Sequence, residues 1–193
     1  MRLDPVHDLQ KAFRKILSAA ASPGEIVDLE AEARLIDLEI PVGKGLALVA
    51  LTLLDAETTF HVWPKEPAAR TRTISHMTYS RGAEPSEADY VLVADPSCAA
   101  AAIASAKAGT LVDPHLGATI VVQVATLSEK GGLALSGPGI ESMKRLGIEP
   151  RPDWIAAREA RNVEYPLGVD LVLVDEASRL AFLPRTTTIR EEG

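Results

Sequence analysis

Cysteine and long hydrophobic runs are scarce in this chain. Cys98 is the only cysteine among 193 residues, which excludes an internal disulfide and is typical of the reducing cytoplasm. The longest apolar run, Leu46–Leu54, is interrupted only by Thr52 and is far too short to span a bilayer. Residues 1–5 also lack the apolar stretch of a signal peptide. We therefore expect a cytoplasmic protein that makes no contact with a membrane.

Basic residues are also fewer than acidic residues. The chain has 20 lysines and arginines against 27 aspartates and glutamates, which gives a net charge of −7. A general nucleic-acid-binding protein needs a basic face to neutralise phosphates, so the composition argues against nucleic acid as a partner. The same balance leaves room for a local basic pocket that binds a nucleotide, and for association with a more basic protein.

What the chain does contain fits one compact domain over residues 1–193. The apolar content of 47% and the charged content of 24% are ordinary for a soluble globular protein. Apolar, β-branched runs predict strands, and apolar steps of three and four residues predict helices. The expected strands lie near 59–63, 90–94, 118–127, 133–136, 169–174 and 180–183, and the expected helices near 5–20, 46–54, 70–79, 98–107 and 154–158. This order predicts an α/β fold with a mixed β-sheet flanked by helices.

Caps and turns sharpen three of these expectations. Asp4 is a good N-cap for the first helix and Pro5 suits the first helical position. Asp153 is expected to cap the helix near 154–158 in the same way. The glycine-containing stretch 128–132 predicts a turn that joins the strands on either side of it as a hairpin. The apolar stripe of the first helix is expected at Val6, Leu9, Phe13, Ile16, Leu17 and Ala20.

Arg185 and the threonines after it are the strongest candidate for an anion site. They follow the last predicted strand, which stops at Pro184 because proline removes a ladder donor. The guanidinium is a planar fork of donors, and the hydroxyls of Thr186, Thr187 and Thr188 add others, a combination that suits a phosphoryl group. The alternative is that Arg185 pairs with an internal acid, or that the segment docks a partner, and we favour this structural or docking role.

A second candidate is the turn Gly137-Pro138-Gly139. Two glycines between a strand and a possible helix can expose backbone N–H groups to a phosphate. Pro138 removes one such donor, and the pattern is neither a Walker loop nor a dinucleotide fingerprint. A tight strand-to-helix connection is the simpler interpretation, and we favour it.

The other titratable residues show no catalytic pattern. Asp55 and Glu57 follow a buried element and could hold a metal or do acid–base work. They could equally accept backbone donors at a helix end or bind another subunit, and we interpret them as structural. No Ser-His-Asp or Cys-His arrangement can be found, so we expect no catalytic residue and no metal. The histidines, which show no metal-ligand spacing with one another or with the cysteine, are His7, His61, His76 and His115.

Several short motifs are spread in a fixed order over nearly the whole chain. They are Asp4-Pro5-Val6-His7-Asp8 with Phe13-Arg14, Pro23-Gly24, Thr52-Leu53-Leu54-Asp55 with Glu57-Thr58, Gly109-Thr110 with Pro114 and Ala118-Thr119, Leu135-Ser136-Gly137-Pro138-Gly139-Ile140, and Pro166-Leu167-Gly168-Val169-Asp170 with Leu183-Pro184-Arg185-Thr186-Thr187. In this order they resemble one family, the PhnH subunits of the bacterial carbon–phosphorus lyase system, and only the stretch 64–87 matches poorly.

The resemblance implies a fold similar to that of pyridoxal phosphate-dependent transferases, without the cofactor. A working cofactor site needs a Schiff-base lysine, an acid for the pyridinium nitrogen and a phosphate cup. The lysines of this chain do not lie beside recognisable motifs of the other two kinds, so no cofactor is expected.

The resemblance also implies partners and a reaction. Family members form homodimers when isolated and assemble with the other core subunits of the system, PhnG, PhnI and PhnJ. The assembly is linked to transfer of an alkylphosphonate to the ribose of ATP with release of adenine. We expect this chain to be an accessory subunit that is not catalytic by itself. The alternative is an independent enzyme or sensor that binds a nucleotide or phosphonate through Arg185 and the Gly137–Gly139 turn.

Overall fold

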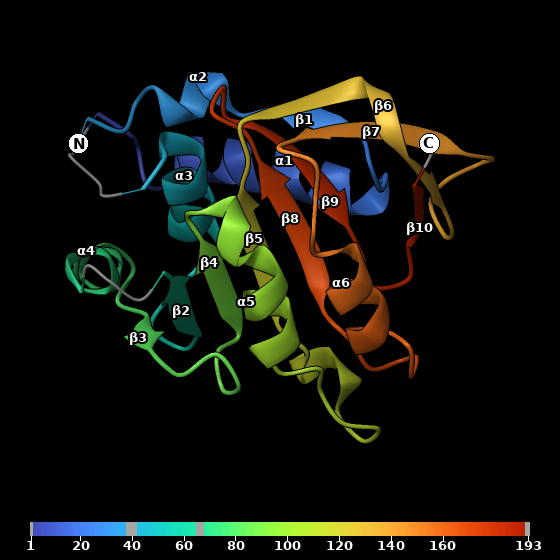
Figure 1. Ribbon diagram of the computed structural model, residues 1–193. Coiled ribbons are helices and arrows are strands. Elements are labelled where there is room, and N and C mark those ends of the chain that lie inside the picture. Colours follow the sequence, from blue (N-terminus) through green and yellow to red (C-terminus); the bar gives the residue numbers. More distant parts are fainter. Residues whose placement is uncertain (1, 38–41, 65–67, 192–193) are drawn as a thin grey trace.

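A mixed β-sheet forms the centre of the molecule in the computed structural model, which describes residues 2–37, 42–64 and 68–191 (Figure 1). Its strands are β1 (Ile26–Asp28), β2 (Thr59–Trp63), β3 (Arg81–Gly82), β4 (Tyr90–Val93), β5 (Thr119–Gln123), β8 (Asp170–Val174) and β9 (Arg179–Leu183). Within the described residues their order is β1-β9-β8-β5-β4-β2-β3. The strands from β8 to β3 are parallel, whereas β9 pairs antiparallel with both β8 and β1.

The central strands are apolar on both sides because both faces of the sheet are covered. Successive side chains of a strand point to opposite faces, so each strand contributes to two hydrophobic clusters. In β5, Ile120 belongs to one cluster and Val121 to the other, and in β8 Leu171 and Val172 divide in the same way. The apolar runs near 90–94 and 169–174 are therefore confirmed as buried strands. The single strand predicted over 118–127 is wrong beyond Gln123, because β5 ends there and residues 126–127 belong to a second sheet.

Helices lie on both faces of the sheet (Figure 1). One cluster lies between the sheet and α1 to α4, and the other between the sheet and α5 and α6. The helices are α1 (His7–Ala21), α2 (Glu30–Ala33), α3 (Lys44–Leu53), α4 (Ala69–Thr78), α5 (Ala99–Ser105) and α6 (Ile155–Arg161), with short 3₁₀ turns η1 (Pro96–Cys98) and η2 (Pro114–Leu116). The predicted α/β class with a mixed sheet flanked by helices is confirmed.

No helix in the described part of the chain has the length and apolar character to cross a membrane.

A second, smaller sheet packs beside α6, and its strands differ from the hairpin predicted across 128–132. It consists of β6 (Thr126–Ser136), β7 (Lys144–Glu149) and β10 (Thr188–Glu191), in the antiparallel order β10-β6-β7. The hairpin predicted across 128–132 is wrong, because β6 continues through these residues as one long strand. Its partner is β7, which the sequence analysis missed, and the register shifts between Ser128 and Leu133. The glycines therefore form an irregularity within a strand instead of a turn.

Helix α1 begins at His7 instead of the predicted Pro5, with Val6 and not Asp4 at the capping position, and it presents a different face to the core. The Asp4 carboxylate accepts the backbone N–H groups of His7 and Val6, and these bonds lower its pKa to about 2. The core-facing residues are Ala12, Ile16 and Ala19. The predicted stripe is wrong at three positions, because Val6, Phe13 and Leu17 are 68%, 47% and 58% exposed.

The remaining helices follow the sequence with small shifts. The runs 46–54, 70–79 and 98–107 correspond to α3, α4 and α5. The helix expected after residue 153 is α6, but its cap is not Asp153. Trp154 occupies the capping position, no side chain caps the helix, and the indole is buried in the core.

Candidate functional site

Arg185 lies in a turn after β9, where its guanidinium is held by an internal acid. Its Nη2 donates to Asp170 Oδ2 at 2.6 Å and its Nε to Asp170 Oδ1 at 3.3 Å, while the backbone N–H of Arg185 donates to the same Oδ1 at 2.7 Å. The two side chains are only 14% and 22% exposed. This fork-to-carboxylate arrangement is the internal pairing that the sequence offered as the alternative to an anion site.

The remaining donors of Arg185 bind two loops. Its Nη1 donates to the carbonyl oxygen of Pro114 at 2.8 Å and to that of Pro166 at 3.4 Å. Pro114 belongs to the loop before β5 and Pro166 to the loop before β8, so one side chain joins the amino ends of two central strands. Three of its nitrogens are engaged in the fold, which leaves little of the guanidinium for a ligand.

Two polar side chains, Arg158 in α6 and Asn162 directly after it, bind the turn that contains Arg185. Arg158 is buried, and it donates from Nη1 to the Thr187 carbonyl at 3.0 Å and from Nη2 to the Pro184 carbonyl at 2.6 Å. Burial lowers the pKa of Arg158 to about 10, while the charge of Asp170 acts in the opposite direction, so the guanidinium is cationic at neutral pH. The amide nitrogen of Asn162 donates to the Arg185 carbonyl of this turn at 3.5 Å and to the Val169 carbonyl at 3.2 Å, and its amide oxygen accepts the Val169 N–H at 2.8 Å.

Roles for Arg158, Asn162 and Asp170 were not predicted, although helical spacing gave a signal for the first two. Arg158 and Asn162 follow the buried Trp154 at steps of four residues, which places all three on one face of a helix. The pairing of Leu171 with Leu183 puts Asp170 at the strand end beside the turn that holds Arg185. Spacing and register therefore locate these partners.

The glycine turn and the threonines are partly brought together. A Cβ on Gly137, whose φ is +131°, would lie 2.8 Å from the Thr186 carbonyl oxygen, so the two turns touch. Gly139 instead lies against Ala21 and Pro23, at the end of α1. The Thr187 side chain is buried, and its hydroxyl has no hydrogen-bond partner among the described residues.

The glycine turn also differs from its predicted connection. It joins β6 to β7, so the expected strand-to-helix connection is wrong. The reason is that the chain after residue 140 forms the antiparallel partner of β6, with Leu135 opposite Lys144. An N–H cradle at a helix start does not form here, because the turn leads into a strand.

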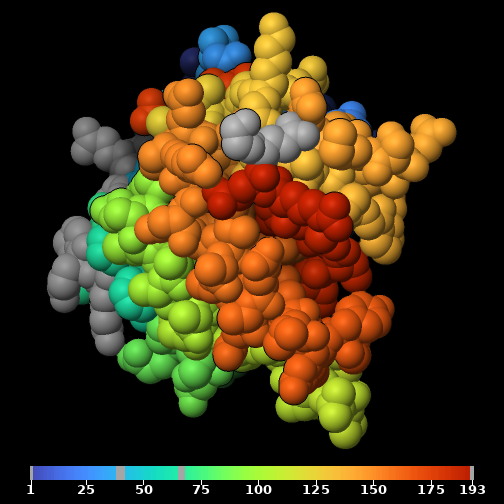
Figure 2. Space-filling model, turned by 45° about the vertical axis from the view of Figure 1, so that its right-hand side comes forward, coloured from blue at the N-terminus to red at the C-terminus, as the bar shows by residue number. Residues whose placement is uncertain are grey.

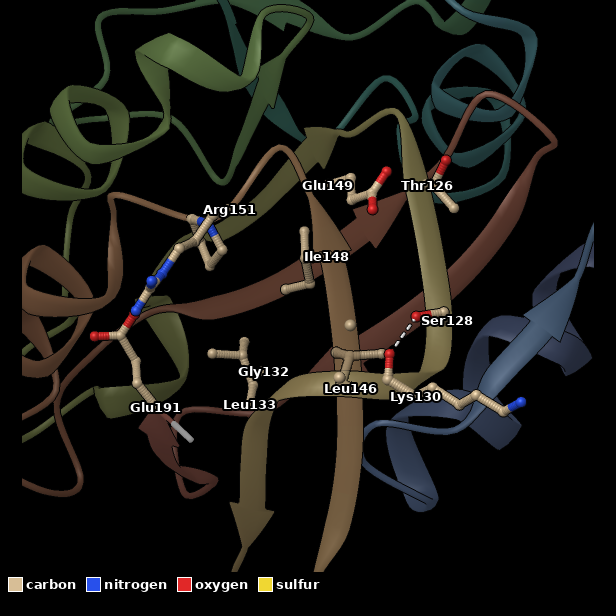
Figure 3. Close-up of a pocket in the computed structure, with 13 residues that line it drawn as sticks. Thr126, Ser128, Lys130, Gly132, Leu133, Leu146, Ile148, Glu149, Arg151 and Glu191 are labelled. Atoms are coloured by element: carbon tan, nitrogen blue, oxygen red, sulfur yellow. Dashed lines mark hydrogen bonds and ion pairs between the residues drawn. The ribbon is translucent and has the colours of Figure 1, made fainter. Parts of the chain in front are cut away.

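A hollow of about 400 Å³ lies on the small sheet (Figure 3). Leu133, Leu146 and Ile148 form its apolar floor, and an ion pair of Arg151 with Glu191 at 3.0 Å borders it. The Arg151 and Glu191 side chains lie together at one border in the close-up, and Lys130 points away from the floor (Figure 3). The lining also includes the polar side chains of Thr126, Ser128 and Glu149, so the hollow is mixed in character and its arginine is already paired.

Two of the titratable residues considered in the sequence, Asp55 and His61, have structural partners. Asp55 accepts the N–H groups of Glu57 and Thr58 at 2.9 and 3.1 Å, which is the helix-end role that we favoured. The buried His61 bonds the carbonyl oxygen of Ala83 through Nδ1 at 2.7 Å. Across residues 2–37, 42–64 and 68–191, no group of three or more His, Cys, Asp or Glu side chains is arranged to hold a metal ion.

Comparison with known proteins gives one consistent relationship. The model of the bacterial phosphonate metabolism protein family PhnH matches residues 2–190. HtxG of Stutzerimonas stutzeri, a putative C–P lyase subunit protein by its name, is 34% identical over 95% of this chain and 87% of its own length. The alpha-D-ribose 1-methylphosphonate 5-triphosphate synthase subunit PhnH of Rhizobium meliloti is 29% identical over 98% of this chain and 94% of its own. The chain therefore belongs to the PhnH family of bacterial phosphonate metabolism proteins.

Proposed function

We propose that this chain is an accessory subunit of a carbon–phosphorus lyase core complex. In that role it supports transfer of an alkylphosphonate to the ribose of ATP with release of adenine, as part of phosphonate catabolism. The observation that carries the proposal is the similarity, over 98% of the chain, to a protein named as a subunit of a ribose 1-methylphosphonate 5-triphosphate synthase.

The geometry favours a supporting role over a catalytic one. The proposed reaction needs protonation of the adenine leaving group, stabilisation of a cationic ribose and a clamp for the triphosphate. Arg185, the best candidate for the clamp, donates to Asp170 and to two backbone carbonyls. Its neighbour Arg158 is likewise used by the backbone of the same turn. Both arginines therefore serve the fold, and another subunit is the better source of the catalytic groups.

The proposed partners are the other core subunits, PhnG, PhnI and PhnJ, in the cytoplasm, with a homodimer when the chain is isolated. The net charge of −7 is compatible with association with a more basic protein surface.

We also propose that the fold is related to pyridoxal phosphate-dependent transferases but binds no cofactor. The second part of this proposal, that no cofactor binds, is supported by two lysines that are already ion-paired, Lys15 with Glu32 at 2.7 Å and Lys107 with Asp89 at 2.5 Å. A Schiff base needs a free amino group beside a phosphate cup. Incubation with pyridoxal phosphate followed by borohydride should leave the mass of the protein unchanged, and a stable adduct at one lysine would contradict this proposal.

Two measurements on the same preparation test the proposed function. The chain, co-expressed with tagged PhnG, PhnI and PhnJ of the same system, should be recovered with them in a fixed ratio after affinity and size-exclusion steps. Calorimetry of the isolated chain with ATP and with methylphosphonate should show no binding heat. Tight binding of either ligand that Arg185→Ala abolishes would support the independent enzyme or sensor instead.

A further inference from the structure

Half of the large apolar side chains that are exposed in the described residues come from two loops. Leu111, Val112 and Leu116 are 76%, 86% and 47% exposed, and Val163 and Tyr165 are 77% and 73% exposed. The first three lie in the loop 108–117 before β5, and the other two in the loop 162–168 before β8. We call these five residues the apolar loop patch. Soluble monomers rarely expose a group of this kind without a binding role.

The two loops lie side by side at the amino ends of β5 and β8. In Figure 1 both project below the sheet, and in Figure 2 the yellow-green atoms of one meet the orange atoms of the other at the lower edge. A Cβ on Gly117 would clash with the Gly168 carbonyl oxygen, which confirms their contact. The two loops that carry the patch therefore form one projection.

The backbone beneath the patch is fixed by the hydrogen bonds around Arg185. The guanidinium joins the carbonyl groups of Pro114 and Pro166, one from each loop. The N–H of Gly168 donates to the Ala108 carbonyl at 2.9 Å, and Arg161 donates to the Ala106 carbonyl. A surface held in this way loses little conformational entropy when it binds, which favours affinity. The structural role of Arg185 thus gives the loops a defined shape.

The charges in these loops indicate what kind of surface covers them. In the loops between α5 and β5 and between α6 and β8 the acids are Asp113 and Glu164, and the one lysine or arginine, Lys107, is already paired with Asp89. A second copy of this chain would bring the same acids close together and carries the same net charge of −7, which opposes pairing through this face. A partner with basic residues around an apolar hollow has the complementary charge.

We propose that the apolar loop patch is the surface by which this chain docks onto another protein subunit, whose contacting face is apolar and bordered by lysine or arginine. This inference rests on the proposed function. Val112 and Tyr165 are the anchors, because Val112 is the most exposed apolar side chain of its loop and Tyr165 is the aromatic residue of the other. Asp113 and Glu164 form the polar border.

The test measures binding of the purified chain to the purified assembly of PhnG, PhnI and PhnJ. Val112→Ser combined with Tyr165→Ser should weaken binding by about tenfold or more, because exposed anchors that are buried on binding carry most of an interface's energy. Leu17→Ser, at a similarly exposed apolar residue of α1, is the matched control and should bind like the unmodified chain. Asp113→Asn with Glu164→Gln should reduce the association rate and its dependence on salt.

The outcomes separate the two proposals. Equal binding by the patch variant and the unmodified chain, at unchanged melting temperature, would overturn the docking surface and leave the accessory role intact. Absence of binding by the unmodified chain would overturn the accessory role and the docking surface together. If the patch variant instead converts a dimer of the isolated chain into a monomer and still binds the assembly, the patch belongs to a second copy and the proposal is wrong.

Discussion

Removal of the Arg185 side chain tests whether this residue serves the fold or a ligand. Arg185→Ala leaves the Asp170 carboxylate, 22% exposed, without its guanidinium, and it removes the donor shared by the loop carbonyls of Pro114 and Pro166. Loss of one partner of a buried ion pair costs about 3–5 kcal/mol, and the partial exposure of this pair places the expected loss at about 3 kcal/mol. For a domain of this size that corresponds to a melting temperature lower by about 6–12 °C.

Denaturant unfolding and thermal melting of matched variants provide the assay. Arg190→Ala, an exposed arginine of the neighbouring strand, is the control and should change stability by less than about 0.5 kcal/mol. Arg185→Lys keeps the charge but loses the planar fork, so it should fall between Arg185→Ala and the unmodified protein. A double-mutant cycle with Asp170→Asn should show a coupling energy above about 1 kcal/mol. Arg185→Ala with unchanged stability would refute the structural role.

Two further perturbations address the glycine turn and the acid stability. Gly137→Ala places a Cβ 2.8 Å from a backbone carbonyl oxygen at φ +131°, so it should lower the free energy of unfolding in urea by about 1–3 kcal/mol. Gly132→Ala, whose Cβ would have no atom within 4 Å, should not destabilise the protein. Equal effects of the two substitutions would contradict the close approach at Gly137. Burial acts to raise the pKa of Asp89, but bonds from Lys107 and a threonine outweigh it and lower the pKa. Its stabilisation is therefore present above about pH 4 and lost as pH falls through the folded pKa. Asp89→Asn should flatten the acid unfolding curve, which the exposed Asp153→Asn should leave unchanged.

The layered fold was predictable because the sequences of its central strands are recognisable without their neighbours. The runs in β5 and β8 are dominated by apolar, β-branched residues, as burial on both faces demands, and each lies between polar turns. Helices α3 and α5 were found for a similar reason, since alanine and leucine dominate them over a length that exceeds a typical strand. Fold class therefore followed from composition and run length.

The small sheet was not predictable from local sequence. Glycines near residue 131 suggested a turn, yet β7 supplies a partner along the whole of β6 and keeps the chain extended. Gly147 allows this, because a Cβ there would clash with Ser128 Oγ and would lie 2.5 Å from the Lys130 carbonyl oxygen. The strand at 144–149 carries mixed charge and weak alternation, so tertiary pairing decides its conformation.

The exposed side of α1 shows the limit of hydrophobic periodicity. Leu17 and Phe13 follow the helical spacing as well as Ile16 does, but the core side is chosen by the small residues Ala12 and Ala19, which let the helix approach its neighbours. For the candidate site the sequence offered the right alternatives. It named Arg185 and an internal acid, and the register of β8 with β9 identified that acid as Asp170.

The central claim is that this chain supports the transferase reaction without catalysing it. The most direct test is adenine release from ATP in the presence of methylphosphonate, measured with PhnG, PhnI and PhnJ purified together, with and without this chain added back. Adenine release should increase several-fold when the chain is added, and the chain alone should release none. Adenine release by the isolated chain would contradict its non-catalytic role. An equal rate of release by the three subunits with and without the chain would contradict its supporting role.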